Sequence, residues 1–463
     1  MFAPNIYAQR RQQLIENIDS GLILLLGNEL SPMNCEDNTY AFRQDSSFLY
    51  YAGIDLHHLA IIIDVDQGDT TLFGVDLTVE GVVWTGPQPT MREYADRSGI
   101  ELSADYGQLS KVLQKANAQG RKVHFLPPYR PENKILLHQL LNIPINNLQE
   151  SVSVELIKAI VAQRSVKSNE EIIEMEKAVN ITADMHVAAM RAARLGIKEA
   201  ELAGMVEGMA ISSGGQLAYP VILTVNGQTL HNHYHGNTLT SGKMVLGDFG
   251  ASSSMHYAGD ITRTFPVDKK FTQQQREIYN IVLAAENEVI DALKPGVSYY
   301  EMHEKSATII TEGLKELGLM RGNTQEAVRA GAHALFFPHG LGHMIGLDVH
   351  DMEDIGEDYV GYDKTIQRNP LFGFKSLRLG RKLEPGFVIT VEPGIYFIPE
   401  LITMWESENK HANFINYPAL GQYLDFGGIR IEDNVMITQD SHRVLGTPIP
   451  KTITEVENIR AGS

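Results

Sequence analysis

The sequence predicts a two-domain protein of the α/β (α+β) class. Its 463 residues exceed what one hydrophobic core usually organises, so two domains are expected. In the first third of the chain, short apolar runs alternate with amphipathic segments, which is typical of a sheet covered by helices. In the rest, long helical segments with polar caps separate short apolar strands. We place the boundary near residues 165–168, which gives domains 1–165 and 166–463.

The first domain is predicted from buried strands and amphipathic helices. Residues 22–26, 59–65 and 71–75 are short, mostly aliphatic runs, so each is predicted to be a buried strand. Residues 108–118 and 132–141 space their apolar side chains as helices do. The alternation indicates an α/β domain with a largely enclosed sheet.

The second domain is predicted to begin with a long helix. Ser168 and Glu171 form a capping box, in which each side chain satisfies a free backbone N–H of the other residue. Apolar side chains at helical spacing continue to about residue 194, and Gly196 is the expected stop. Three more helices are predicted over residues 198–212, 272–293 and 299–317.

Short strands are also predicted in the second domain, and several of them carry acidic residues. They are predicted over residues 221–225, 244–249, 261–265, 387–391 and 429–437. In the last of these, Arg430 and Glu432 are two residues apart and should share one face. After the fourth, Pro393 and Gly394 predict a turn that ends the strand.

Composition and charge exclude several classes of function. With 43% hydrophobic and 21% charged residues, the chain is an ordinary globular protein. Its net charge of −18 argues against nucleic acid as a partner, since phosphate binding needs clustered Lys and Arg. The single cysteine, Cys35, excludes an internal disulfide and a cysteine-rich zinc site. No signal peptide and no apolar run of about 20 residues is found, so we expect a cytoplasmic protein without membrane association.

Asp248 and Asp260 are the first pair of residues that suggest chemistry. Asp248 lies within an apolar strand and Asp260 opens the next, so antiparallel pairing would bring both carboxylates to one end. Two close carboxylates repel each other and need a shared proton or a cation. Hairpin punctuation by aspartate is an equally good explanation of the pair taken alone.

Three further residues turn this pair into a set. His343 lies in a glycine-lined segment, and Glu392 and Glu432 occupy strand positions expected to be buried. Each alone has a structural explanation, as a core histidine or a strand-end acid that reaches solvent. Together, four acids and a histidine are not tolerated unpaired in a core, and two divalent ions would resolve the conflict. Oxygen-rich ligation favours Mn²⁺ over thiolate-seeking metals, with Co²⁺ or Zn²⁺ as alternatives, and a two-metal site generates hydroxide at neutral pH.

Five ordered segments resemble the metal motifs of the pita-bread metallopeptidases, most closely their Xaa-Pro branch, aminopeptidase P and prolidase. They are residues 248–251, 259–266, 339–343, 391–396 and 428–433. Residues 40–53 resemble the N-terminal domain of that branch, so the likeness covers nearly the whole chain. It implies a creatinase-like α/β domain followed by a pita-bread catalytic domain.

The resemblance also implies roles for the five residues. Asp248 would chelate one metal ion, and His343 and Glu392 the other. Asp260 and Glu432 would bridge both ions. The nucleophile would be a bridging hydroxide, and Glu392 would pass its proton to the leaving imide nitrogen of an X-Pro bond.

Further residues match the surroundings of that site. His233, His339 and His350 match histidines that orient substrate and stabilise the tetrahedral intermediate. For His233 the register is open, because two other histidines are its close neighbours. Arg430 and Tyr396 resemble residues that brace the metal ligands.

The segment 356–383 bears on the choice within the branch. It is longer than in the compact aminopeptidase P pattern and resembles eukaryotic-type prolidase, in which an arginine matching Arg378 grips the free carboxylate of a dipeptide. An Xaa-Pro dipeptidase is therefore slightly favoured over an aminopeptidase for longer peptides, although Arg378 is equally well explained as a surface residue. Trp84 resembles a tryptophan that reaches a neighbouring subunit, and a homodimer is implied.

Two hypotheses of other kinds stand beside a metal-dependent exopeptidase for small proline-containing peptides. One is a metal-free enzyme of the same fold, such as creatinase, whose sign would be lost metal ligands, yet all five positions are filled here. The other is a non-catalytic pita-bread binding module. The sequence leaves open the residue before proline, the native metal and the oligomeric state.

Overall fold

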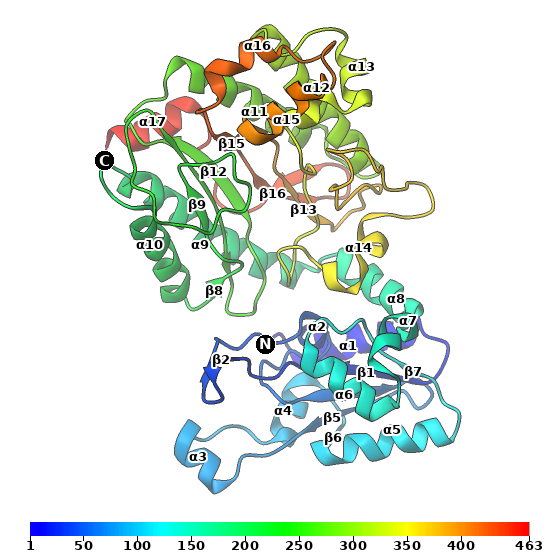
Figure 1. Ribbon diagram of the computed structural model, residues 1–463. Helices are drawn as coiled ribbons and strands as arrows, with labels where there is room; N and C mark the ends of the chain where they lie inside the picture. The colour runs from blue at the N-terminus through cyan, green and yellow to red at the C-terminus, as the bar shows by residue number, and fades with distance from the viewer. Residues whose placement is uncertain (463) are drawn as a thin grey trace. The chain divides into compact units, whose positions relative to one another are not determined.

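The structure, a computed structural model, describes residues 1–462 and divides into two compact units (Figure 1). The first unit comprises Met1–Arg164 together with Met352–Tyr359. The second comprises Ser165–Asp351 and the chain from Val360 onward. Both units combine helices with sheets, so the predicted mixed α/β class is confirmed. None of the helices within residues 1–462 is long and apolar enough to cross a membrane.

A five-stranded mixed sheet forms the centre of the first unit. Its order is β6-β5-β4-β1-β7, with β5–β6 and β1–β7 parallel and the other neighbours antiparallel. The strands are β1 (Leu22–Leu26), β4 (Ala60–Asp64), β5 (Asp69–Gly74), β6 (Leu102–Asp105) and β7 (Val123–His124). A short hairpin, β2 (Pro32–Cys35) and β3 (Asn38–Thr39), lies outside this sheet.

Helices cover the sheet because its strands bury side chains on both faces. Leu22, Leu24 and Ile62 pack against Leu113 and Leu137 in one core cluster. Successive side chains of a strand point to opposite faces, so buried Ile23 and Ile63 define a second core. The helices of this unit are α1 (Pro4–Ile15), α2 (Ser46–Ala52), α3 (Val79–Thr85), α4 (Met91–Ser98), α5 (Leu109–Ala118), α6 (Pro131–Leu141), α7 (Leu148–Ser151) and α8 (Val154–Ser165), with α14 (Glu353–Gly361) later in the chain.

Capping boxes begin two of the long helices of the second unit, the first of them as the sequence predicts. The Ser168 side chain accepts from the backbone N–H of Glu171, whose carboxylate accepts in return, and Thr272 and Gln275 repeat the pattern. Such caps stabilise a helix by about 1 kcal/mol each. The helices are α9 (Asn169–Ala192), α10 (Glu199–Ser212), α11 (Gln273–Ala292), α12 (Tyr299–Glu316), α13 (Thr324–Ala330), α15 (Pro399–Ser407), α16 (Tyr417–Leu420) and α17 (Ile453–Ala461).

Several small antiparallel sheets lie between these helices (Figure 1). Their orders are β12-β10-β9, β13-β16-β17, β14-β15 and β11-β8. The strands are β8 (Gln216–Leu217), β9 (Ile222–Thr224), β10 (Met244–Phe249), β11 (Ala251–Ser252), β12 (Ile261–Pro266), β13 (Val388–Val391), β14 (Gly394–Tyr396), β15 (Gly428–Arg430), β16 (Asp433–Ile437) and β17 (His442–Val444). A bridge between Thr262 and Glu432 joins two of the sheets.

Two predictions about strands are wrong. The run 429–437 is not one strand, because β15 pairs with β14 and β16 pairs with β13 on either side of a break at 431–432. Pro393 and Gly394 do not form a turn. Proline lacks an N–H and interrupts the ladder, yet Gly394 immediately resumes it as the first residue of β14. The interruption therefore moves the chain from one sheet to another without reversing it.

Candidate active site

The antiparallel pair β10 and β12 brings Asp248 and Asp260 together. Asp248 lies opposite Thr262, and Asp260 directly precedes β12. The hydroxyl oxygen of Tyr219 lies 2.7 Å from Asp248 Oδ1 and 2.5 Å from Asp260 Oδ1, so both carboxylates converge on one point. A Cβ at Gly250 would lie 1.7 Å from the carbonyl oxygen of Gly259, so this close approach of the two strands requires glycine.

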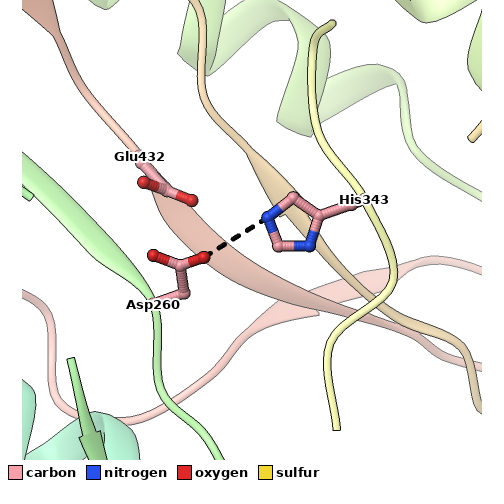
Figure 2. Close-up of side chains that lie close together, drawn as sticks. All are labelled: Asp260, His343 and Glu432. Carbon is pink, nitrogen blue, oxygen red and sulfur yellow. Dashed lines mark ion pairs between the residues drawn. The ribbon is translucent and has the colours of Figure 1, made fainter. Parts of the chain in front are cut away.

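Asp260, His343 and Glu432 form a buried cluster from three separate segments (Figure 2). One potential ligand atom from each lies within 4.8 Å of the others. His343 Nε2 is 3.3 Å from Asp260 Oδ2 and 3.5 Å from Glu392 Oε1, so Glu392 adjoins the same cluster. These residue types at these separations are suited to holding a cation.

The pKa shifts in and beside the cluster also favour a bound cation. Burial raises the pKa of Glu432 well above its usual value, and the charges of Asp260 and Glu392 raise it further. Burial also raises the pKa of Glu392 to about 7. Among the described residues, Glu432 Oε1 is buried without a hydrogen-bond partner. Crowded, unsatisfied carboxylate oxygens are costly in a protein interior unless a cation receives them, so this donor set fits divalent metal ions.

Arg430 and Tyr396, which the sequence analysis expected to brace the metal ligands, contact Asp248 and His339 beside the cluster. Arg430 Nη2 forms an ion pair with Asp248 Oδ2, and its Nη1 donates to the Tyr396 hydroxyl at 2.7 Å. That hydroxyl is 2.8 Å from His339 Nε2. Burial, followed by the charge of Arg430, lowers the pKa of His339 to about 3, so this imidazole is neutral near pH 7.

Two threonines that the sequence analysis missed hold the acidic side chains in place. Thr262 Oγ1 donates to Glu432 Oε2 at 2.6 Å. Thr390 Oγ1 accepts from the His343 backbone N–H at 3.0 Å and lies 3.2 Å from Glu392 Oε1. Each threonine is two residues from an acid, Asp260 or Glu392, and therefore shares its face of the strand. That spacing is a usable sequence signal, whereas nothing in the sequence distinguishes Tyr219.

The pocket that opens onto this cluster has an empty volume of about 640 Å³. Seven predicted site residues line it: Asp248, His339, His343, His350, Arg378, Glu392 and Arg430. Asp260, Glu432 and Tyr396 do not line the pocket, but Asp260 and Glu432 adjoin His343, and Tyr396 contacts His339 and Arg430. The His350 ring packs edge-on against His343 with ring centres 4.4 Å apart.

His233 is a predicted site residue that neither lines the pocket nor is joined to its lining by the contacts above. The wall is formed instead by His231, with Leu230 and Ser376. His233 follows in an exposed loop, between Asn232 and Tyr234, whose own hydrogen bond turns the backbone there. Three histidines at alternate positions give the sequence no means of choosing which one faces inward.

Comparison with known proteins adds independent findings. Residues 173–439 match metallopeptidase family M24, and residues 7–124 match the aminopeptidase P N-terminal domain. The human Xaa-Pro dipeptidase is 31% identical over 99% of this chain and 93% of its own length. A probable Xaa-Pro aminopeptidase of Sordaria macrospora is 33% identical over 98% of this chain and 95% of its own length.

Two solved structures superpose on this chain over its entire length. Zn-substituted aminopeptidase P of Escherichia coli, in complex with product, superposes with a TM-score of 0.82 at 27% identity and covers 100% of this chain and 99% of its own. The aminopeptidase PepP of Pseudomonas aeruginosa gives a TM-score of 0.82 at 27% identity, with 100% and 98% covered. The predicted N-terminal and pita-bread catalytic domains are thereby confirmed, and the chain belongs to metallopeptidase family M24.

Proposed function

We propose that this protein is a dinuclear-metal exopeptidase that cleaves the X-Pro bond after the first residue of short peptides. The observation that carries the proposal is the pocket floor, where the clustered atoms of Asp260, His343 and Glu432 adjoin Asp248 and Glu392. Relatives that bear the names Xaa-Pro dipeptidase and Xaa-Pro aminopeptidase support the substrate class.

The metal ligands we propose follow from these side chains. Asp248 would hold one ion, His343 and Glu392 the other, and Asp260 and Glu432 both. Four carboxylates and one imidazole favour Mn²⁺, with Co²⁺ or Zn²⁺ as alternatives. When bound, a pair of divalent ions lowers the pKa of water and polarises the carbonyl of the bond that is cut.

The chain's own residues would supply proton transfer and orientation. Glu392 lines the pocket beside the other proposed metal ligands, where a carboxylate can take a proton and return it to the leaving nitrogen. His339 and His350 lie in the same wall, where they can bind substrate and stabilise charge that develops on its carbonyl oxygen. For the role assigned to His233, the geometry favours His231.

Between the two activities, we favour the dipeptidase. Arg378 lines the pocket beside Ser376, where its guanidinium can bind a carboxylate of the substrate. In an Xaa-Pro dipeptide the free carboxylate belongs to the proline itself, whereas in a longer peptide that position is a peptide bond. The human and Sordaria relatives are similarly close and bear different names, so they do not decide between the two.

Substrate length decides the question by experiment. The Mn²⁺-loaded protein is assayed on Ala-Pro and on Ala-Pro-Ala, as wild type and as Arg378→Ala. We expect wild type to prefer Ala-Pro and the variant to lose that preference. Arg381→Ala is the matched control, because Arg381 pairs with Glu384 and does not line the pocket. Equal turnover of both peptides by wild type and variant would reject the dipeptidase, and no turnover of either would reject the peptidase.

We also propose a cytoplasmic homodimer. Helix α3 has no buried residue, and Val79, Val83 and Trp84 are 85%, 77% and 80% exposed. Apolar side chains gathered on one short helix are typical of a contact surface, and a second copy of the chain is the occupant we propose. Sedimentation of wild type and Trp84→Glu tests this, since the variant should shift toward monomer.

The proposed cytoplasmic location is supported by Cys35, because an exposed, unpaired cysteine suits a reducing compartment.

A further inference from the structure

The chain passes between its two units close to a buried ion pair. It enters the second unit at Ser165 and leaves it after Asp351, before returning at Val360. Lys167 and Asp351 therefore stand at the two ends of a long stretch of the second unit. Their side chains meet there, with Lys167 Nζ 2.7 Å from Asp351 Oδ2 and each side chain only 1% exposed.

Asp351 closes the loop that carries His350. Its backbone N–H donates to the carbonyl oxygen of Met344 at 2.9 Å, and its Oδ1 accepts from the N–H of Asp348 at 3.3 Å. The loop thus begins next to His343 and ends next to His350, whose rings pack together. One oxygen of Asp351 fixes the loop internally, and the other is held by Lys167.

Lys167 is itself anchored to the strand that supplies Glu392. Its backbone N–H donates to the carbonyl oxygen of Gly386 at 2.8 Å, and the chain runs from there into β13. Lys167 therefore connects the residues just before β13 to Asp351, the residue that ends the loop carrying His350. An ion pair removed from water is costly unless its geometry is well satisfied, so this contact is specific.

Gly346 provides the space for the pair. A Cβ at this position would lie 2.5 Å from Asp351 Oδ2 and 2.9 Å from Lys167 Cε. No positive φ is needed at Gly346, so alanine would fit the backbone conformation, and the three atoms nearest to its Cβ all belong to the ion pair. A Gly346→Ala change therefore disturbs the geometry of the pair and leaves both charges in place.

We propose that Lys167 and Asp351 are positioning residues that set the place of His350 in the pocket wall. The inference rests on the proposed function, in which His350 contacts substrate. A shift of the loop would move the imidazole relative to the reacting carbonyl, and displacements of about 1 Å cost about 100-fold in rate. Three of the five proposed ligands, Asp248, Asp260 and Glu432, come from other segments. His343 and Glu392 lie beside the loop and the anchored strand, so Mn²⁺ binding is measured to separate a loss of metal from a shift of His350.

The test measures kcat, KM and Mn²⁺ binding for Lys167→Met, Asp351→Asn and Gly346→Ala. We expect a fall in kcat of about 10- to 100-fold, with the stoichiometry of Mn²⁺ binding unchanged. In a His350→Ala background the same changes should cost less than about 3-fold, because residues that act through one group are not additive. Arg460→Met is the matched control: Arg460 is a buried cation that donates to the carbonyls of Met190, Ala193, Pro266 and Val267, away from the pocket.

A readout independent of turnover separates this inference from the proposed function. The histidine ring resonances in NMR spectra, assigned with His350→Ala, should shift for His350 in Lys167→Met and in Gly346→Ala, and should not shift in Arg460→Met. If these resonances stay in place, or if kcat falls equally with and without His350, the positioning role is wrong. Should wild type fail to cleave any Xaa-Pro peptide while the resonances shift, the proposed function fails and the positioning role stands.

Discussion

Glu432 and Asp433 are neighbours in sequence with opposite electrostatic surroundings. Glu432 faces the cluster of carboxylates, and burial together with its acidic neighbours raises its pKa well above the usual value. Asp433 is buried as well, but Arg263 and Lys451 outweigh that burial and lower its pKa to about 2. Adjacent acids thus differ because successive side chains point to opposite sides of the chain.

The group around Asp433 is balanced internally. Arg263 Nη2 lies 2.6 Å from Asp433 Oδ1, and Lys451 Nζ lies 2.8 Å from Asp433 Oδ2 and 3.0 Å from Glu286 Oε2. Two acids therefore meet two cations. Around Glu432, by contrast, the acids exceed the cations that contact them. Removing one partner from a balanced buried group leaves an uncompensated charge and destabilises the fold, whereas an unbalanced group is suited to receive a metal ion.

The largest expected effect on catalysis comes from replacing Glu392, one of the acids grouped around Glu432. Glu392→Ala should lower kcat on Xaa-Pro peptides by at least about 1000-fold, since Glu392 is both the proposed general acid–base group and a proposed metal ligand. The melting temperature of the metal-free protein should stay near that of wild type, because a buried carboxylate of raised pKa is removed. Steady-state kinetics and thermal melts check this, with exposed Glu384→Ala as the control. Near-normal turnover would remove Glu392 from the mechanism.

Adjacent substitutions test the contrast directly in the metal-free protein. Asp433→Asn leaves Arg263 and Lys451 without their shared carboxylate and should lower the free energy of unfolding by about 3–5 kcal/mol. Glu432→Gln removes the cost of burying an acid among other carboxylates and should leave that free energy equal or higher. Urea unfolding with metal chelated gives both values. Equal destabilisation by the two changes would mean that both groups are structural.

The stabilisation gained on Mn²⁺ binding should distinguish these two variants. Mn²⁺ at about 100 times its Kd stabilises a folded protein by about 2.7 kcal/mol per site. Wild type and Asp433→Asn should both gain stability on Mn²⁺ addition, and Glu432→Gln should gain much less. Melting curves with and without a chelator measure the difference. A full Mn²⁺ response in Glu432→Gln would exclude Glu432 as a ligand.

The sequence predicts local features of this molecule well and its tertiary choices poorly. The capping box at Ser168 and Glu171 was predictable because its interactions span three residues. The break between β15 and β16 was not, because the alternating pattern at 429–437 is equally consistent with one strand, and only pairing with two different sheets separates its halves.

The residues of the candidate site likewise differ in whether local sequence could predict them. Acids such as Asp248 and Glu392 stand out because apolar strands rarely carry them. Which histidine faces the pocket depends on the path of the loop, so His231 and His233 could not be distinguished. The buried pair of Lys167 and Asp351 joins segments 184 residues apart, a distance over which no local pattern operates.

The last prediction concerns the pH dependence of the buried charged group around Asp433. Burial, with the charge of Asp433, raises the pKa of Glu286 from 4.5 to about 8, although Lys451 and Arg263 oppose the rise. The folded state therefore holds a proton that the unfolded state releases above pH 4.5, so the free energy of unfolding should fall as pH rises from about 4.5 to about 8. The slope for one group is at most about 1.4 kcal/mol per pH unit. Glu286→Gln should flatten this decline in the metal-free protein, measured by urea unfolding across that range. A decline of unchanged slope would show that Lys451 and Arg263 keep Glu286 ionised, and that the balanced group carries its full charge at neutral pH.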